Sequence, residues 1–482
     1  MNLRVTLNLV GILNLFLALA MVAPLAVALI YQDGTSLVFL ASIALTVAVS
    51  LVMIWACRRN FHDEVRHREG MAVVALGWFS AGLFGALPFY LHGTFPTYMD
   101  CLFEALSGFT TTGASVLTEI ESLPHGILFW RSLTHWLGGM GIIVLTIAIL
   151  PFLGVGGMQL FKAEVPGPVA DKLKPRITET AKLLWQVYLL FTAAEVLLLV
   201  LGGMSLFDSF CHTFGTLATG GFSTKNASIG HYNSTYFDVV ITVFMLLSGI
   251  NFALHYQALT GNLKAFYRNS ELQFFLAVFV IATVMITWSI FSAGLYSFPN
   301  SIRYAAFQVA SIVTTTGYAT ADYEKWPWLC QMVLVLLIFI GGSAGSTGGS
   351  IKCVRIMLLF KHGYRELRRL IHPRAVIPVK LGGQTVGDDV LHSVWGFFIL
   401  YMGLFVVAAV ILSAMDVDLV TSFTAVAATI GNIGPGLGLV GPAENYAHLP
   451  YAAKGILILC MVLGRLEVYT VFILFVPEFW RK

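Results

Sequence analysis

Charged side chains are scarce in this sequence. Asp, Glu, Lys and Arg make up only 11% of its 482 residues, against about a quarter in soluble domains. The six cysteines are scattered without CxxC or another ligand spacing, so the sequence predicts neither a disulfide framework nor a metal site. It also lacks a Gly-Lys-Ser/Thr phosphate loop, and we expect no nucleotide to bind to this chain itself. A soluble domain is excluded.

Apolar runs recur from end to end of the sequence. A hydrocarbon core of about 30 Å takes roughly 20 helical residues. Ten runs predict spanning helices: residues 7–31, 36–57, 71–93, 128–152, 183–203, 236–260, 272–296, 326–360 with an interruption, 392–415 and 452–477. Most of the 28 basic residues then lie on one side, and the positive-inside rule predicts that both termini are cytoplasmic.

One pattern, which begins with Phe and ends with Gly, occurs four times at intervals of about 100 residues. Its copies are residues 103–113, 210–221, 307–317 and 423–434. Each lies in an apolar stretch too short to cross a membrane, near 97–113, 207–221, 301–317 and 418–434, which predicts re-entrant segments. Non-helical backbone at membrane depth lines a water-filled path or is buried in protein, and fourfold recurrence favours a pore.

The predicted fold is therefore an all-α membrane protein. Four repeats of helix, re-entrant pore loop and helix surround a central pore, and two additional transmembrane helices precede them. The predicted units are residues 1–69 for the additional helices, then 70–160, 161–265, 266–372 (with the interrupted helix) and 373–482 for the four repeats.

Local signals place the short helices. A small residue stands six positions before each terminal glycine, as expected for close packing: Ser107, Gly215, Ser311 and Ala428. Polar N-cap candidates precede each short helix: Asp100, Asp208, Asn300 or Ser301, and Asp418. Each short helix then directs its C-terminal end, with its partial negative charge, toward the axis.

The loops after the short helices have the composition of an ion filter. A dehydrated monovalent cation needs several oxygen ligands, which rings of backbone carbonyls supply, and glycine lets the carbonyls turn inward. The candidate filter residues are Thr111, Thr112, Gly113, Thr219, Gly220, Gly221, Thr315, Thr316, Gly317, Asn432, Ile433 and Gly434. Within this set, K+ is expected at Thr112, Gly113, Gly220, Gly221, Thr316, Gly317, Ile433 and Gly434. Capping and bracing remain the alternative for the threonines. The fourth loop lacks the Thr run, so we expect a chemically asymmetric ring.

Four motifs together resemble one family. The Thr-Thr-Thr-Gly loops, the glycine-rich residues 341–350, the Asn-Ile-Gly-Pro-Gly-Leu-Gly run at 432–438 and Gly-Arg-Leu-Glu-Val at 464–468 are similar to the TrkH family, the membrane subunits of bacterial Trk potassium-uptake systems. The resemblance covers essentially the whole chain, and the two additional helices match TrkH better than its KtrB relatives. It implies a bacterial inner-membrane K+ transporter, a homodimer, and a cytoplasmic nucleotide-binding regulatory subunit like TrkA.

The resemblance also bears on the interrupted eighth run, whose composition cannot hold a rigid helix. In the family the matching segment blocks the cavity, so the expected gate is Gly341, Gly342, Ser343, Ala344, Gly345, Ser346, Thr347, Gly348 and Gly349. Close helix packing through small residues is the alternative. The Gly-Gly-Ser-Ala-Gly run also matches a nucleophile elbow, but no strand precedes it and no His is placed to act as a base, so we expect no enzyme.

Arg465 stands within the last apolar run, where a charge is costly and indicates function. A pore-facing Arg465 would be a barrier to cations, and Arg occupies the matching position in the family. The alternatives are an ion pair with Glu467 or another buried acid, or hydrogen bonds to carbonyls. Glu467, two residues away, does not face Arg465 well on a helix.

A proton- or sodium-coupled secondary transporter is the rival function, since broken helices also bind ions in such proteins and Glu104, His135 and His212 are titratable. The basic inner loops near 162–182 and 352–380 are candidate docking sites for the regulatory partner or for anionic membrane lipid. No nucleic acid is expected as a partner.

Overall fold

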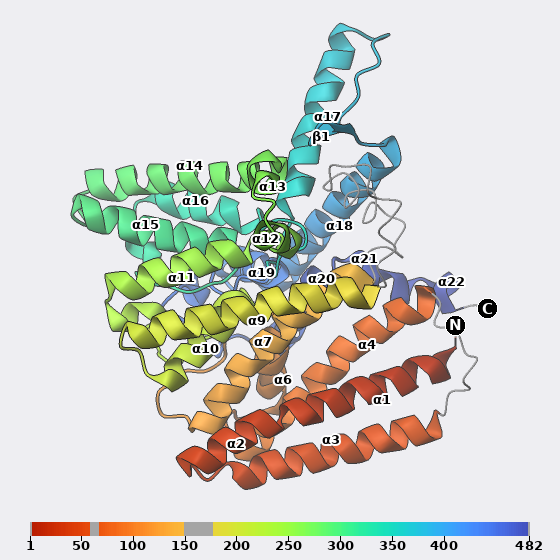
Figure 1. Cartoon of the computed structure of the whole chain (residues 1–482), viewed down its shortest axis with the longest axis vertical. Coiled ribbons are helices and arrows are strands. Elements are labelled where there is room, and N and C mark those ends of the chain that lie inside the picture. Colours follow the sequence, from red (N-terminus) through yellow and green to blue (C-terminus); the bar gives the residue numbers. More distant parts are fainter. Residues whose placement is uncertain (1, 58–66, 149–176, 481–482) are drawn as a thin grey trace.

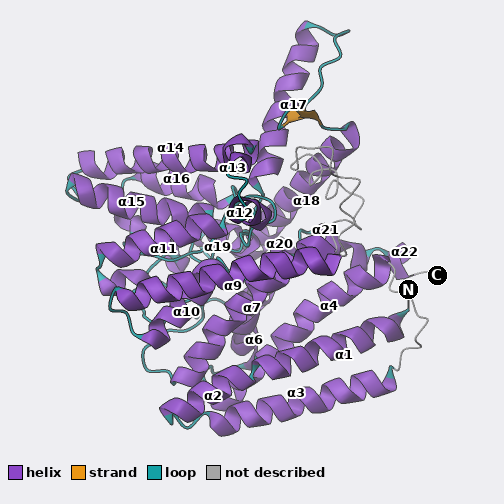
Figure 2. Ribbon diagram, in the orientation of Figure 1, coloured by secondary structure: helices purple, strands orange, loops and turns teal. Residues whose placement is uncertain are grey.

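The computed structural model describes residues 2–57, 67–148 and 177–480. Within these residues the chain is almost entirely helical (Figure 2). Its strands are β1 (Lys380–Leu381) and β2 (Gln384–Thr385), which pair as a small antiparallel hairpin. The predicted all-α class is confirmed.

Two candidate spans precede the repeated part of the chain. The first, Leu3–Tyr31, comprises α1 (Leu3–Ala20) and α2 (Val22–Tyr31), and the second is α3 (Ser36–Ala56). Helices α1 and α3 lie side by side (Figure 1). The buried face of α3 carries Ser42, Thr46 and Ser50, each of which donates its hydroxyl to the carbonyl four residues earlier. Small polar residues that face a neighbouring helix while leucines face outward are typical of helices packed in a membrane.

The remaining helices follow in the predicted order. The first group is α4 (His67–Gly85), α5 (Leu87–His92), α6 (Tyr98–Phe109) and α7 (His125–Ala148). The second is α9 (Ile177–Leu201), α10 (Leu206–Leu217), η3 (Ser228–Tyr232), α11 (Thr235–Ser248), α12 (Phe252–Leu259) and α13 (Lys264–Arg268). The third is α14 (Ser270–Ser292), α15 (Phe298–Val313), η4 (Tyr323–Lys325), α16 (Trp328–Ile338) and α17 (Cys353–Ile371). The fourth is α18 (Asp388–Ser413), α19 (Leu419–Ile430), η5 (Gly438–Val440), α20 (Tyr451–Arg465), α21 (Tyr469–Phe472), η6 (Ile473–Phe475) and α22 (Pro477–Trp480).

Length and composition separate the outer helices from the inner ones. Among the described residues, six helices are long and apolar enough to cross a membrane, or eight if each of two bent pairs counts as one span. The prediction of ten crossings therefore stays a prediction. The short helices α6, α10, α15 and α19 bury most of their C-terminal halves on every side. A helix buried all round belongs to the core, so the core of the molecule lies at these helix ends.

Two predicted continuous runs are broken. The run 236–260 bends by 101° between α11 and α12, and the run 452–477 bends by 112° between α20 and α21. At the first bend, Asn251 caps α12 by accepting a hydrogen bond from the Ala253 N–H at 2.8 Å. At the second, Glu467 and Val468 adopt positive φ of 57° and 52°, which no helix accommodates. The predicted interruption of the eighth run lies between α16 and α17.

Two predicted helix caps are displaced by three residues. Thr97 and Ser205, rather than Asp100 and Asp208, are the N-caps of α6 and α10, and each accepts the N–H of that aspartate. The aspartate accepts the hydroxyl proton in return, at 2.6 Å for Thr97 and 2.9 Å for Ser205. Ser297 precedes α15, in place of Asn300 or Ser301, and Asp418 caps α19 as predicted.

The two ends of the described chain lie on the same side of the molecule (Figure 1). Glu69 at the start of α4 accepts the N–H of Asn2 at 2.8 Å, and Phe479 of α22 packs against Met71 and Ala72. The first boundary between repeats, at 160, and most of the predicted docking loop 162–182 lie outside the described residues.

Candidate functional site

The four short helices end in the same way. After each helix the chain makes a tight cap, in which a backbone N–H returns to the carbonyl of the small residue near the helix end. The bonds join Thr112 N to Ser107 O, Gly220 N to Gly215 O, Thr316 N to Ser311 O and Ile433 N to Ala428 O, each at 2.8 Å. This geometry is that of a Schellman cap. The recurring small residue is thus the acceptor of the cap in every copy.

Backbone angles repeat as closely as the hydrogen bonds. The residue two positions before each terminal glycine has a positive φ: 51° at Thr111, 54° at Thr219, 63° at Thr315 and 54° at Asn432. The terminal glycines follow with 77° at Gly113, 80° at Gly221, 84° at Gly317 and 96° at Gly434. Non-glycine residues rarely adopt this conformation, so its recurrence at four equivalent positions indicates a backbone held for function.

The four loops meet in a closed ring, which comprises residues 110–113, 218–221, 314–317 and 431–434. A Cβ on Gly113 would overlap the carbonyl oxygen of Gly220 in the second loop. A Cβ on Gly221 would likewise overlap the carbonyl oxygen of Thr316, and a Cβ on Gly317 would overlap that of Ile433. A Cβ on Gly434 would lie 2.7 Å from the Thr112 carbonyl oxygen, which closes the circle. Each terminal glycine therefore faces a carbonyl of the next loop, and no side chain fits there.

The predicted asymmetry of the ring is present in its side chains. In the first loop the hydroxyls of Thr110 and Thr112 share a hydrogen bond at 2.8 Å, and in the third those of Thr314 and Thr316 do the same. The fourth loop instead carries Asn432, whose Nδ2 donates to the Thr112 hydroxyl and to a helix carbonyl, both at 2.9 Å. The side chains of the Thr runs thus brace the loops.

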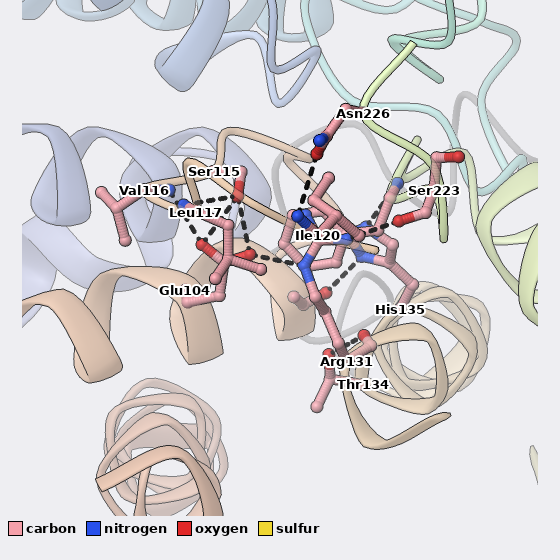
Figure 3. A network of polar contacts seen from close by, with 12 residues as sticks. Glu104, Ser115, Val116, Leu117, Ile120, Arg131, Thr134, His135, Ser223 and Asn226 are labelled. Atoms are coloured by element: carbon pink, nitrogen blue, oxygen red, sulfur yellow. Dashed lines mark hydrogen bonds and ion pairs between the residues drawn. The ribbon is translucent and has the colours of Figure 1, made fainter. Parts of the chain in front are cut away.

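A buried ionic network supports the first two loops (Figure 3). Glu104 accepts hydrogen bonds from Arg131 Nε at 2.6 Å and from the Val116 N–H at 3.0 Å. Arg131 Nη1 donates to the Ser223 carbonyl at 2.9 Å, so the pair joins the first loop to the second. His135 bonds to the Gly108 carbonyl at 2.8 Å. Removing one partner of such a buried pair leaves an uncompensated charge, at a cost of about 3–5 kcal/mol.

Around the rest of the ring, tyrosine hydroxyls rather than an ionic network bind the backbone carbonyls. Tyr318 donates its hydroxyl to the His212 carbonyl at 2.9 Å, Tyr446 to the Gly434 carbonyl at 2.6 Å, and Tyr323 to the Gly436 carbonyl at 2.9 Å. Beside them, Glu324 accepts the N–H of Gly438. Burial raises the pKa of the Glu324 carboxyl, which outweighs the lowering effect of that hydrogen bond. These contacts fix the loop segments beyond the terminal glycines.

The glycine-rich loop, residues 341–350, lies against the helix ends next to the ring. Its Gly349 N–H donates to the Thr315 hydroxyl at 2.6 Å, and the Thr347 hydroxyl donates to the carbonyl of Leu217, the last residue of α10. A Cβ on Gly349 would overlap the Gly431 carbonyl oxygen. The loop therefore contacts the second, third and fourth short-helix ends at once.

The bend between α11 and α12 holds the same loop. The Ser343 N–H donates to the Gly249 carbonyl at 2.8 Å, and the Phe252 N–H donates to the Gly345 carbonyl at 3.1 Å. Where α11 ends, its last carbonyls lack helical partners and are free to accept these bonds. This role of the bend was not predicted from the sequence, although Gly249 and Asn251 within an apolar run were a signal for a break.

Two buried cations bind consecutive carbonyls of the glycine-rich loop. Arg465 Nη1 donates to the Thr347 carbonyl at 2.7 Å, and Lys352 Nζ donates to the Gly348 carbonyl. Arg465 is 3% exposed. Glu467 does not pair with Arg465: it binds Arg355 at 2.6 Å. Of the alternatives for Arg465, hydrogen bonding to carbonyls is present. Lys352 was not among the predicted site residues.

The candidate residues therefore form two adjacent parts. The twelve predicted filter residues lie in the ring, and the predicted gate residues lie in the glycine-rich loop against it, with Arg465 at the contact. Among the described residues, no group of three or more His, Cys, Asp or Glu side chains has the arrangement of a metal site. The chemistry available to a cation at the ring is that of carbonyl and hydroxyl oxygens.

Proteins of known family are similar to this chain over nearly its whole length. The TrkH family model, described as a cation transport protein, matches residues 35–482. The Trk system potassium uptake protein TrkH of Salmonella typhimurium is 45% identical, with 100% of both chains covered. The Trk system potassium uptake protein TrkG of Escherichia coli is 38% identical, over 100% of this chain and 99% of the relative. The crystal structure of the potassium transporter TrkH from Vibrio parahaemolyticus superposes with a TM-score of 0.92 at 39% identity and covers 100% of both chains.

The helical fold, the apolar helices and these similarities define a multi-pass membrane transport protein. More particularly, the chain belongs to the TrkH family of cation transport proteins.

Proposed function

We propose that this protein takes up K+ across the bacterial inner membrane through a gated, channel-like path. The observation that carries the proposal is the closed ring, in which each terminal glycine faces a carbonyl of the next loop. Carbonyl rings replace the hydration shell of an alkali cation without a fixed charge. The similar transporters named above are potassium uptake proteins, which favours K+ as the substrate.

The ring acts as the selectivity filter in this proposal. K+ is bound by the backbone oxygens of Thr112, Gly113, Gly220, Gly221, Thr316, Gly317, Ile433 and Gly434. The C-terminal ends of α6, α10, α15 and α19 add partial negative charge beside the ring. A negative-inside membrane potential favours entry of one positive charge by about 2.3 kcal/mol per 100 mV, so uptake needs no other energy source.

The glycine-rich loop acts as the gate, and Arg465 acts as a barrier to cations. Support comes from the contacts of this loop with three of the four short-helix ends, which hold it against the ring. Both termini are cytoplasmic in the proposed orientation. The proposed assembly is a homodimer regulated by a nucleotide-binding subunit like TrkA. The relatives are named as parts of a Trk system, which supports a partner subunit. The basic residues of α17 face anionic lipid or this subunit.

One observation favours coupled transport as a second candidate. Glu195 on α9 is fully buried and forms no ion pair within the described part of the chain. Buried carboxyl groups in membrane helices commonly mark proton pathways. Proton-coupled K+ transport is therefore the alternative that the first experiment has to separate.

The test is tracer flux into liposomes that contain the purified protein, measured for K+, Rb+ and Na+ with and without a pH gradient. Flux that follows the K+ or Rb+ gradient and ignores pH is the expected result. Flux that requires a proton or Na+ gradient would replace the channel-like path with coupled transport.

A further inference from the structure

Glu271, in the first turn of α14, joins the glycine-rich loop to the start of α17. Glu271 is 3% exposed, and one of its carboxylate oxygens, Oε1, accepts two backbone hydrogen bonds. The donors are the Ala344 N–H at 2.8 Å and the Val354 N–H at 3.0 Å. Ala344 lies in the loop and Val354 in the first turn of α17, so a single oxygen holds both.

The base of the glycine-rich loop is closed by further bonds to the same turn. The Gly341 N–H donates to the Ile351 carbonyl at 2.8 Å, and the Cys353 N–H donates to the Gly342 carbonyl at 3.2 Å. The Cys353 thiol contacts the Gly341 carbonyl at 3.0 Å. The two ends of the loop therefore cannot separate without breaking contacts to the first turn of α17.

Electrostatics favours this position for a carboxylate. The first turn of a helix presents unpaired N–H groups and a partial positive charge, which a carboxylate neutralises. Helix α17 then extends well beyond the body of the molecule (Figure 1). Its outer part is held to the start of α18 by the Arg365 to Asp388 ion pair at 2.6 Å. A displacement of α17 therefore acts directly on the bonds that Glu271 makes.

We propose that Glu271 is a positioning residue that keeps the glycine-rich loop against the ring and makes the loop follow movements of α17. This inference rests on the proposed gating role of the loop. Charged acceptors make hydrogen bonds about twice as strong as neutral ones, so Glu271→Gln weakens both bonds and Glu271→Ala removes them.

Accessibility of Cys353 tests the proposal without relying on transport. The thiol is fully buried beneath the loop. In a background where the other five cysteines are replaced by alanine, labelling of Cys353 by a small membrane-permeant thiol reagent reports release of the loop. We expect Glu271→Ala to accelerate labelling and basal K+ flux by about tenfold, which corresponds to ~1.4 kcal/mol. Glu271→Gln should fall between this variant and the parent.

Glu69→Ala is the matched control, because Glu69 is also buried and also accepts a backbone N–H, from Asn2, far from the ring. It should leave labelling unchanged. Parental labelling and flux in a folded Glu271→Ala protein would overturn the proposal. If Glu271→Ala does not fold, Glu271→Gln decides: faster labelling supports the proposal and parental labelling rejects it. A parent that conducts no K+ would refute the proposed function, while the labelling result would still stand on its own.

A double-mutant cycle tests whether Glu271 transmits movements of α17 to the glycine-rich loop or only stabilises that loop. Asp388→Ala frees the outer part of α17, and we expect it to accelerate Cys353 labelling when Glu271 is present. In the Glu271→Ala background the same change should have no further effect, because the connection is already lost. Additive effects, or no effect of Asp388→Ala alone, would overturn the claim that α17 moves the loop.

Discussion

The ring and the glycine-rich loop are both irregular backbone inside a helical body, but the bonds that hold them differ. Each loop of the ring is capped by its own short helix, as in the bond from Thr112 to Ser107. The glycine-rich loop instead depends on distant partners, among them Gly249, Arg465 and Glu271. Local hydrogen bonds that repeat four times should keep the ring in one conformation. Hydrogen bonds to distant segments can instead break and be replaced when those segments move. In the proposed mechanism, this difference assigns ion selection to the ring and movement to the glycine-rich loop.

The largest effect on ion selectivity is expected at the terminal glycines of the ring, where no side chain fits. A serine at Gly113 or Gly317 places a Cβ against a neighbouring carbonyl and strains a positive φ, which costs at least ~1–2 kcal/mol. We expect the K+ to Na+ flux ratio to fall by roughly tenfold in both variants. Gly403→Ser on α18, where a Cβ meets nothing within 4 Å, is the matched control. Unchanged ion ratios in both variants would remove the filter assignment.

The second effect is on the K+ flux and concerns the contact between Arg465 and the glycine-rich loop. Arg465→Ala removes a buried positive charge and the hydrogen bond to the Thr347 carbonyl. Flux through the open path should rise by about tenfold, equivalent to ~1.4 kcal/mol of barrier, while the K+ to Na+ ratio stays as in the parent. Arg465→Lys keeps the charge and should remain close to the parent. Equal or lower flux in a folded Arg465→Ala protein would contradict the barrier role.

A smaller effect should follow from making the fourth loop resemble the first and third. Asn432→Thr keeps a residue type that tolerates this positive φ at Thr111 and Thr315. It removes the two bonds of Nδ2, and the free energy of unfolding should fall by about 1–2 kcal/mol. We expect a severalfold change in the K+ to Na+ ratio at most. Thermal unfolding and tracer flux measure the two quantities, and an unaltered ratio would show that ring asymmetry does not affect selectivity.

The smallest effect is expected at Glu324, which accepts the N–H of Gly438 beyond the fourth loop. Since burial raises the pKa of Glu324, this carboxyl loses its charge at a higher pH than an ordinary glutamate as the solution is acidified. Its contribution to stability is therefore fully present below the unfolded pKa and is lost as pH rises through the folded pKa. K+ entry should decrease slightly, by about twofold or less, as the solution is acidified from about pH 7, because solvent and salt partly screen the charge of a half-buried carboxylate. Glu324→Gln should flatten this dependence. A steep pH dependence that survives Glu324→Gln would place the titrating group elsewhere.

The sequence predicted best what depends on local backbone chemistry. The four terminal glycines, the small residues near the helix ends and the interruption at 341–350 all follow from φ preferences and helix propensity, and each has its place in the structure. The caps at Thr97 and Ser205 were missed because the aspartate three residues later is equally polar. A Ser/Thr followed three residues later by an acid was the available signal.

What the sequence could not predict is pairing between distant segments. The bend after Arg465 exposes Glu467 to Arg355 of α17, more than a hundred residues earlier in the chain. The bend after Ser248 is stabilised by the glycine-rich loop of the following repeat. Neither partner is visible in a local window of hydrophobicity. For the same reason Glu271 and Lys352 read as ordinary charges at the ends of apolar runs.

The most direct test of the division between ring and loop compares two variants in the same liposomes. Gly113→Ser and Arg465→Ala are each measured for tracer flux of K+ and Na+ under one imposed potential. We expect Gly113→Ser to change the K+ to Na+ flux ratio without raising the K+ flux, and Arg465→Ala to raise the K+ flux without changing that ratio. Variants that shift both quantities together would contradict this division.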